Sequence, residues 1–181
     1  MQTRAADGGG RVLEGHFAVF NQPYQVCGRW VETIAPGAFA KWLAEKRDTK
    51  VLWNHNPDIV LGSTANGTAS FLEDATGLWG TVTINEDDQD ALNAYARVAR
   101  GDVRGCSFGF DIVRQEEWWD DDGVYHTKIL EADLWEGSPC TFPAYTQTDI
   151  SARAAADQQS AETILTNKWR ERMTARLKGA K

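Results

Sequence analysis

Apolar and polar residues alternate along most of the first 145 residues, a spacing that is typical of β-strands with one buried face. The alternating segments are rich in β-branched and aromatic residues and are separated by Gly, Asn and Asp turn signals. We predict strands in residues 11–20, 23–34, 50–55, 67–84, 106–119 and 123–145. The stretch EDATGLWG, residues 73–80, predicts a hairpin turn inside one of them.

Two segments show helical spacing instead. APGAF turns the chain into residues 38–47, where Phe39, Trp42 and Leu43 share one helical face. Residues 87–102, DDQDALNAYARVARGD, repeat apolar positions at i, i+3, i+4 and i+7 from Leu92. Acidic residues begin this segment and arginines end it, which suits the helix dipole, so it predicts an amphipathic helix.

The order of these elements favours an α+β fold with a mostly antiparallel β-core, a barrel or a curled sheet, and peripheral helices. No βαβ alternation or glycine-rich phosphate loop supports a nucleotide-binding fold. We expect a flexible N-terminus over residues 1–10, one domain over residues 11–150, and a helical or flexible C-terminal tail over residues 151–181.

Composition and charge argue against several classes of partner and cofactor. The net charge is −7, and no dense Lys/Arg cluster or long apolar run interrupts the predicted domain, so we expect no nucleic acid and no membrane. The N-terminal sequence lacks the apolar core of a secretory signal. We therefore expect an intracellular protein. Three cysteines without CxxC spacing and three histidines predict no disulfide framework, no metal and no cofactor.

Candidate catalytic residues are few. His55 follows a hydrophobic strand and is flanked by Asn54 and Asn56, so we expect it in a loop, where functional residues are often displayed. Ser107 lies in GDVRGCSFGF, and a serine nucleophile needs a base such as histidine within reach. The neighbouring Cys106 is a rival nucleophile, but strand alternation places it on the opposite face from Ser107.

Acids that orient a catalytic base are also available. Glu136 and Asp133 both lie in the last predicted strand, and an acid there is more often solvated or paired with arginine than catalytic. The DDD of residues 120–122 lacks the glycine and glutamate spacing of a calcium loop and predicts a solvated turn.

Taken together, several blocks resemble the prohead maturation proteases of tailed bacteriophages. The resemblance covers residues 11–153 and rests on the order of the blocks FAVFN, ETIAPGAF, VLWNHN, LGST, GLWGTVTI, GDVRGCSFGF and LWEGSPCTFPAY. That family is related in fold to the herpesvirus assemblins, which implies a β-barrel core surrounded by helices.

The resemblance implies catalytic roles for three residues. His55 corresponds to the base and Ser107 to the nucleophile, and an acid in the E-V-S block corresponds to Glu136. Assemblins use a second histidine as the third member, for which His126 is the alternative here, while Asp133 stays open as well. Gly137 departs from the usual valine of the block.

The function implied is that of a serine endopeptidase that cleaves the major capsid protein, the scaffold and its own chain during prohead maturation. It would act inside the procapsid in the host cytoplasm, or be a prophage-encoded protein of the bacterial cytoplasm. Assemblins are active as dimers, which makes a homodimer an expectation. The alternatives are an inactive scaffold- or capsid-associated structural protein and a cysteine protease that uses Cys106.

Overall fold

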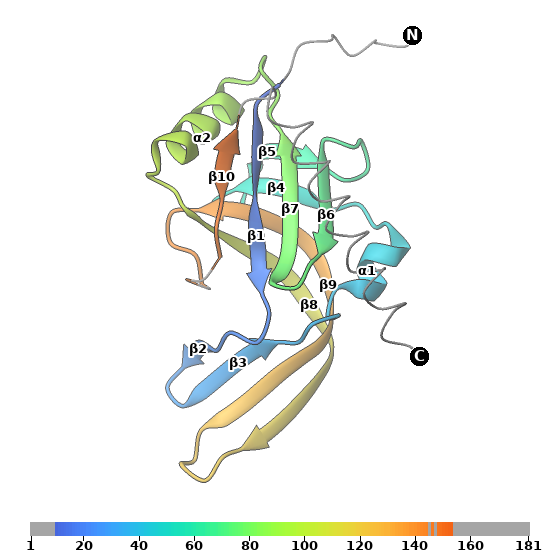
Figure 1. Ribbon diagram of the computed structural model, residues 1–181, viewed down its shortest axis with the longest axis vertical. Coiled ribbons are helices and arrows are strands. Elements are labelled where there is room, and N and C mark those ends of the chain that lie inside the picture. The colour runs from blue at the N-terminus through green and yellow to red at the C-terminus, as the bar shows by residue number, and fades with distance from the viewer. Residues whose placement is uncertain (1–9, 145, 147, 154–181) are drawn as a thin grey trace, which may run out of the picture.

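The computed structural model describes residues 10–144, 146 and 148–153 (Figure 1). Strands dominate these residues, and two helices interrupt them. In chain order the elements are β1 (Val12–Val19), β2 (Tyr24–Cys27), β3 (Trp30–Ile34), α1 (Ala40–Glu45), β4 (Lys50–Trp53), β5 (Asn56–Ser63), β6 (Ala69–Glu73), β7 (Gly77–Thr83), α2 (Gln89–Arg100), β8 (Gly105–Trp119), β9 (Tyr125–Cys140) and β10 (Ser151–Arg153).

The strands form two sheets. One has the order β10-β1-β7-β6 and is antiparallel throughout. The other has the order β2-β3-β9-β4-β5, with β8 paired to β9. The long strand β9 is its spine, because β8 pairs with it antiparallel while β3 and β4 pair with it in parallel at two separate places. Figure 1 shows β8 and β9 running together from the body of the molecule into the lobe that holds β2 and β3.

The mostly antiparallel β-architecture with peripheral helices is confirmed, but closure into a barrel is not. Over the described residues both sheets are open, since each has strands at its two ends that pair on one side only. Alternation in a sequence predicts that a strand forms and which face it buries, but it does not predict the partners of that strand. Here the strand partners produce two sheets instead of one closed surface.

Most individual elements were predicted correctly, and two segments differ. Residues 23–34, expected as one extended stretch, form the hairpin of β2 and β3. The strand β5 was missed because Pro57 and Asp58 are residues typical of loops. Proline is tolerated there because β5 lies at the edge of its sheet, where a missing N–H breaks no ladder on the free side.

The helices begin and end where the sequence indicates. Asp88 caps α2 by accepting hydrogen bonds from the backbone N–H groups of Asp90 and Ala91. Gly101 ends the same helix with a φ of 84°, a left-handed conformation that favours glycine. Contacts place α1 against β6 and β9 and α2 against β5 and β10. Of the described helices, neither is long and apolar enough to cross a bilayer.

Two clusters of buried side chains form the core. Phe17 belongs to one cluster and its neighbour Ala18 to the other, so β1 contributes to both. On β8, Cys106 and Phe108 are likewise buried in the two clusters. The face of β8 that carries these two side chains is therefore the core face.

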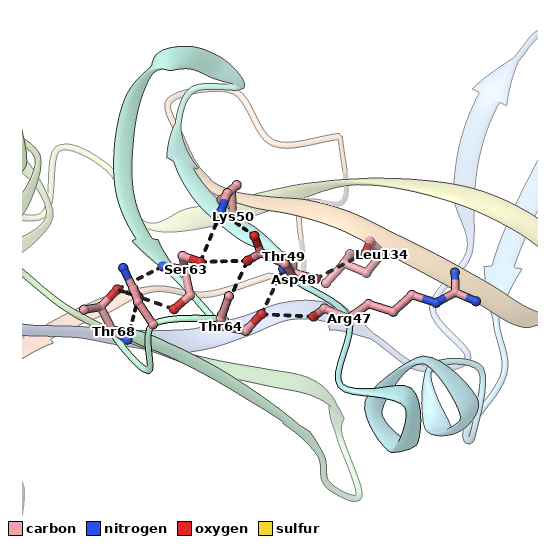
Figure 2. A network of polar contacts seen from close by, with 10 residues as sticks. Arg47, Asp48, Thr49, Lys50, Ser63, Thr64, Thr68 and Leu134 are labelled. Atoms are coloured by element: carbon pink, nitrogen blue, oxygen red, sulfur yellow. Dashed lines mark hydrogen bonds and ion pairs between the residues drawn. The ribbon is translucent and has the colours of Figure 1, made fainter.

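A polar network fixes β4 and β5 together at the ends remote from the turn that joins them (Figure 2). Asp48 accepts a 2.7 Å hydrogen bond from the Ser63 hydroxyl and a 2.6 Å bond from the Lys50 ammonium group. The backbone N–H of Thr49 donates to the Thr64 hydroxyl at 2.8 Å. The β4–β5 hairpin is thus anchored at this end.

The predicted terminal segments are largely outside the described residues. Of the expected tail, residues 151–153 form β10, which pairs antiparallel with β1 at Val12–Glu14. Residues 154–181 and residues 1–9 of the expected N-terminus are not among the described residues.

Candidate active site

His55 lies in a two-residue turn between β4 and β5. Asn54 and His55 have φ values of 51° and 59°, and Trp53 pairs directly with Asn56. Positive φ at both central residues is what a tight hairpin turn of type I′ requires, and Asn and His adopt it more readily than most side chains. His55 thus follows a strand and lies in a connection, as expected, but the connection is a tight hairpin turn that leads directly into β5.

Two hydrogen bonds attach this turn to the end of β9. The Asn54 backbone N–H donates to the Pro139 carbonyl at 3.1 Å, and its side-chain oxygen accepts from the Thr141 N–H at 2.8 Å. The His55 side chain is 45% exposed, so it is reachable from solvent.

Glu136 on β9 contacts the His55 ring. Its Oε1 atom lies 2.6 Å from His55 Nδ1, and the residue is only 6% exposed. Since a carboxylate oxygen accepts, Nδ1 carries the proton in this contact, and in the neutral ring the lone pair is then on Nε2. A buried acid thus fixes both the orientation and the tautomer of the histidine.

Ser138 completes the contact between β9 and the turn. Its hydroxyl donates to Glu136 Oε2 at 2.7 Å and accepts from the His55 backbone N–H at 3.1 Å. Each oxygen of the Glu136 carboxylate therefore has a partner, as a buried acid requires.

Ser107 lies on β8 directly opposite Ser138 on β9. Residues paired across an antiparallel ladder point to the same face, so Ser107 shares the face of Ser138 and Glu136. The strands that flank β9, β8 on one side and β4 on the other, are roughly 10 Å apart at this level because neighbouring strands are spaced by about 4.8 Å. No hydrogen bond joins Ser107 to His55 among the described residues.

Cys106 lies on the opposite face, as the alternation predicts. It is fully buried in a core cluster, and burial, followed by the negative charge of Asp149, raises its pKa well above the usual value. Burial and the charge of Glu136 also raise the pKa of Cys140 to about 11. Neither thiol is a thiolate at neutral pH, and the thiolate is the nucleophilic form.

The other candidate acids and bases lie elsewhere. His126 Nε2 is 2.8 Å from Asp120 Oδ2, and its ring stacks on Trp118 near the far end of β9. Ten residues of extended chain, about 33 Å, separate it from Glu136. Asp133 accepts a 2.6 Å hydrogen bond from Arg47. Of the three candidates for a third member, the structure brings Glu136 to His55 and leaves His126 and Asp133 apart from it.

Two polar groupings were not predicted. Ser138 stands at the serine of the E-V-S block, but no role was predicted for it. His16, on β1, contacts Asp149 at 2.9 Å and Asp74 at 3.1 Å. These acids are 133 and 58 residues away in sequence, so no local pattern could indicate the cluster. Among the described residues, no group of three His, Cys, Asp or Glu side chains is arranged to hold a metal ion.

A buried acid that orients a histidine is one part of the serine–histidine–acid arrangement of serine peptidases. The family model described as caudovirus prohead serine protease matches residues 1–163, and the chain belongs to that family. This confirms the resemblance seen in the sequence blocks.

The chain is similar to one phage protein in sequence and to one solved structure. The prohead protease of Enterobacteria phage HK97 is 31% identical over 164 residues, which cover 87% of this chain and 66% of the phage protein. A crystal structure of the KSHV protease in complex with a hexapeptide phosphonate inhibitor has a TM-score of 0.46 and 13% identity, over 80% of this chain and 65% of that one. The chain thus spans about two thirds of the length of each.

Proposed function

We propose that this chain is a serine endopeptidase of phage prohead maturation in which Ser107 is the nucleophile, His55 the general base and Glu136 the acid that orients the base. The observation that carries the proposal is the 2.6 Å contact between the buried Glu136 carboxylate and His55 Nδ1, beside the strand that bears Ser107. Family membership supports the reaction class.

The chemistry proposed is acyl transfer in two halves. His55 Nε2 takes the proton of the Ser107 hydroxyl as Oγ attacks the carbonyl carbon of the scissile peptide. The imidazolium then gives this proton to the leaving nitrogen as the C–N bond breaks, and the acyl group stays on Ser107. Water, deprotonated by the same ring, hydrolyses the ester and restores the serine. Glu136 stabilises the imidazolium and keeps the ring in its tautomer.

The proposed substrates are the major capsid protein, the scaffold and the chain itself, inside the procapsid. Support comes from the similarity to the prohead protease of phage HK97 and from membership of the caudovirus prohead serine protease family. A homodimer as the active form is part of the proposal, and activity measured against enzyme concentration, with sedimentation under the same conditions, tests it.

Co-expression with the capsid protein of the same phage tests the proposed function. We expect specific truncation of the capsid protein by the wild-type chain, seen as new intact masses, and none with Ser107→Ala or His55→Ala. Cys106→Ala is the matched control, because it changes the neighbouring residue on the core face. Identical capsid masses with all four chains would favour a structural role, and truncation that survives Ser107→Ala would overturn the assignment of the nucleophile.

A further inference from the structure

Ser138 occupies a central position among the residues around His55. The residue is fully buried, at 0% exposure. Its hydroxyl proton goes to Glu136 Oε2, and a lone pair of the same oxygen accepts the backbone N–H of His55. One side chain therefore holds the acid by its carboxylate and the histidine by its main chain.

The two residues it holds both need an external support. His55 has a φ of 59°, an uncommon conformation for a residue with a side chain, and its side chain is almost half exposed. The Glu136 carboxylate can rotate about its last torsion, since such torsions are broad. A hydrogen bond to Oε2 fixes that rotation and directs Oε1 to His55 Nδ1.

Ser138 is unsuited to be a second nucleophile. Its proton points to an acid that already accepts from His55, while the ring nitrogen left free to act as a base, Nε2, is the far one. Its role is thus exerted through Glu136 and His55.

We infer that Ser138 is a positioning residue for the catalytic histidine, an inference that rests on the proposed function. By tying the Glu136 carboxylate to the main chain of His55, it holds the ring in the Nδ1–H tautomer and leaves Nε2, the nitrogen that does not contact Glu136, to act as the base. Orienting groups of this kind act on the rate of the chemical step and not on substrate binding.

Steady-state kinetics of Ser138→Ala test this role. We expect kcat to fall by about 10- to 100-fold, the effect of losing a hydrogen bond to a charged group, with KM changed by less than about threefold. Ser138→Thr, which keeps the hydroxyl, should recover most of kcat. The control is Ser63→Ala: Ser63 is buried and also bonds to an acid, Asp48, but it lies at the opposite end of the β4–β5 hairpin (Figure 2). It should leave kcat unchanged.

A second measurement does not depend on activity. Nitrogen-15 chemical shifts of the His55 ring report which nitrogen holds the proton, and we expect one tautomer in the wild type and a mixture in Ser138→Ala. Unchanged ring shifts, a wild-type kcat in Ser138→Ala, or a loss no larger than its unfolded fraction would each overturn the inference. A wild-type chain with the single tautomer but no peptidase activity would instead contradict the proposed function and leave the positioning role of Ser138 supported.

Discussion

At the scale of single residues, the site depends on a glycine, Gly109, beside the Glu136 carboxylate. Gly109 on β8 lies opposite Glu136, and a Cβ atom built on it would be 2.9 Å from Glu136 Oε1, the atom that contacts His55. The far end of the glutamate can swing aside at little cost to folding, but it then leaves the histidine. Glycine at this position therefore keeps space for the contact between Glu136 and His55.

Gly109→Ala is expected to lower kcat by about 10- to 100-fold while the melting temperature changes little, because misplacing an orienting group mainly affects the chemical step. Gly10→Ala is the control, since its Cβ would meet Thr83 at an ordinary 3.6 Å. Parallel kinetics and thermal melts of the two variants check this. Full activity in Gly109→Ala would show that Glu136 tolerates displacement or is not needed.

Gly137 has a comparable reason for departing from the valine of the family block. Its Cβ would lie 2.6 Å from the ring of Phe17, a fully buried core residue. Phe17 fills the volume that a larger residue at position 137 would use. The departure is thus compensated in the core and leaves the neighbouring Glu136 and Ser138 in contact with His55.

The reactivity of the cysteines distinguishes a serine protease from a cysteine protease that uses Cys106. Because burial raises the pKa of the Cys106 thiol, and that of Cys140 to about 11, a thiol reagent at pH 8 should modify exposed Cys27 and neither of these two. Counting thiols before and after denaturation measures this. Cys106→Ala should keep most activity and lose roughly 1 kcal/mol of folding free energy. Rapid labelling of Cys106 with loss of cleavage would contradict the serine mechanism.

At the scale of elements, the segment before β10 is attached to β1 through a charged cluster of His16, Asp74 and Asp149, of which His16 lies on β1. His16 lies between Asp74 and Asp149, and its own carbonyl accepts from the Asp149 N–H at 3.3 Å. On the other side, the Thr148 hydroxyl bonds to both the N–H and the carbonyl of Cys106, next to Ser107. This segment therefore links β1 to the strand that carries the proposed nucleophile.

The cluster predicts a pH dependence of stability. Burial alone would lower the pKa of His16, but the hydrogen bonds and charges of Asp149 and Asp74 outweigh it and raise that pKa above the usual 6.5. Because the pKa of His16 is higher in the folded state, its protonated ring stabilises the fold fully at pH values below 6.5. This stabilisation is lost as the pH rises through the raised folded-state pKa. The hydrogen bond from His16 lowers the pKa of Asp149, whose contribution is lost only in acid.

His16→Gln should accordingly lower the melting temperature more at about pH 5.5 than at about pH 8.5. Thermal melts of the variant and the wild type across this range check it, with Asp149→Asn expected to show the same trend. An equal difference in melting temperature between variant and wild type at both pH values would mean that the charge of His16 does not stabilise the fold.

Elements with a local signature could be predicted from the sequence, whereas those set by distant partners could not. The helix α2 has its cap, its apolar face and its terminal glycine within the segment itself. The β4–β5 turn depends instead on bonds from Asn54 to residues at the end of β9, far along the chain. The strand β5 was therefore not predicted, because it begins with residues that are typical of loops.

At the scale of the whole molecule, β9 joins the parts of the site. Its residues 136–138 face β8 on one edge and β4 on the other, so a single strand brings together the serine, the acid and the turn that carries the histidine. The proposal of His55, Ser107 and Glu136 as catalytic residues could be made from the order of sequence blocks. The approach of His55 to Glu136, and the part of Ser138 in it, required the pairing of distant strands, since these two residues are 81 positions apart in the sequence.

The central claim is that His55 activates Ser107, and covalent labelling tests it most directly. A fluorophosphonate reacts with an activated serine, and tandem mass spectrometry of the labelled chain locates the adduct. The account predicts one adduct, on Ser107, that is lost in His55→Ala and strongly slowed in Glu136→Gln, while Ser63→Ala labels like the wild type. An adduct on Ser138 or another residue, or labelling of Ser107 that does not depend on His55, would contradict it.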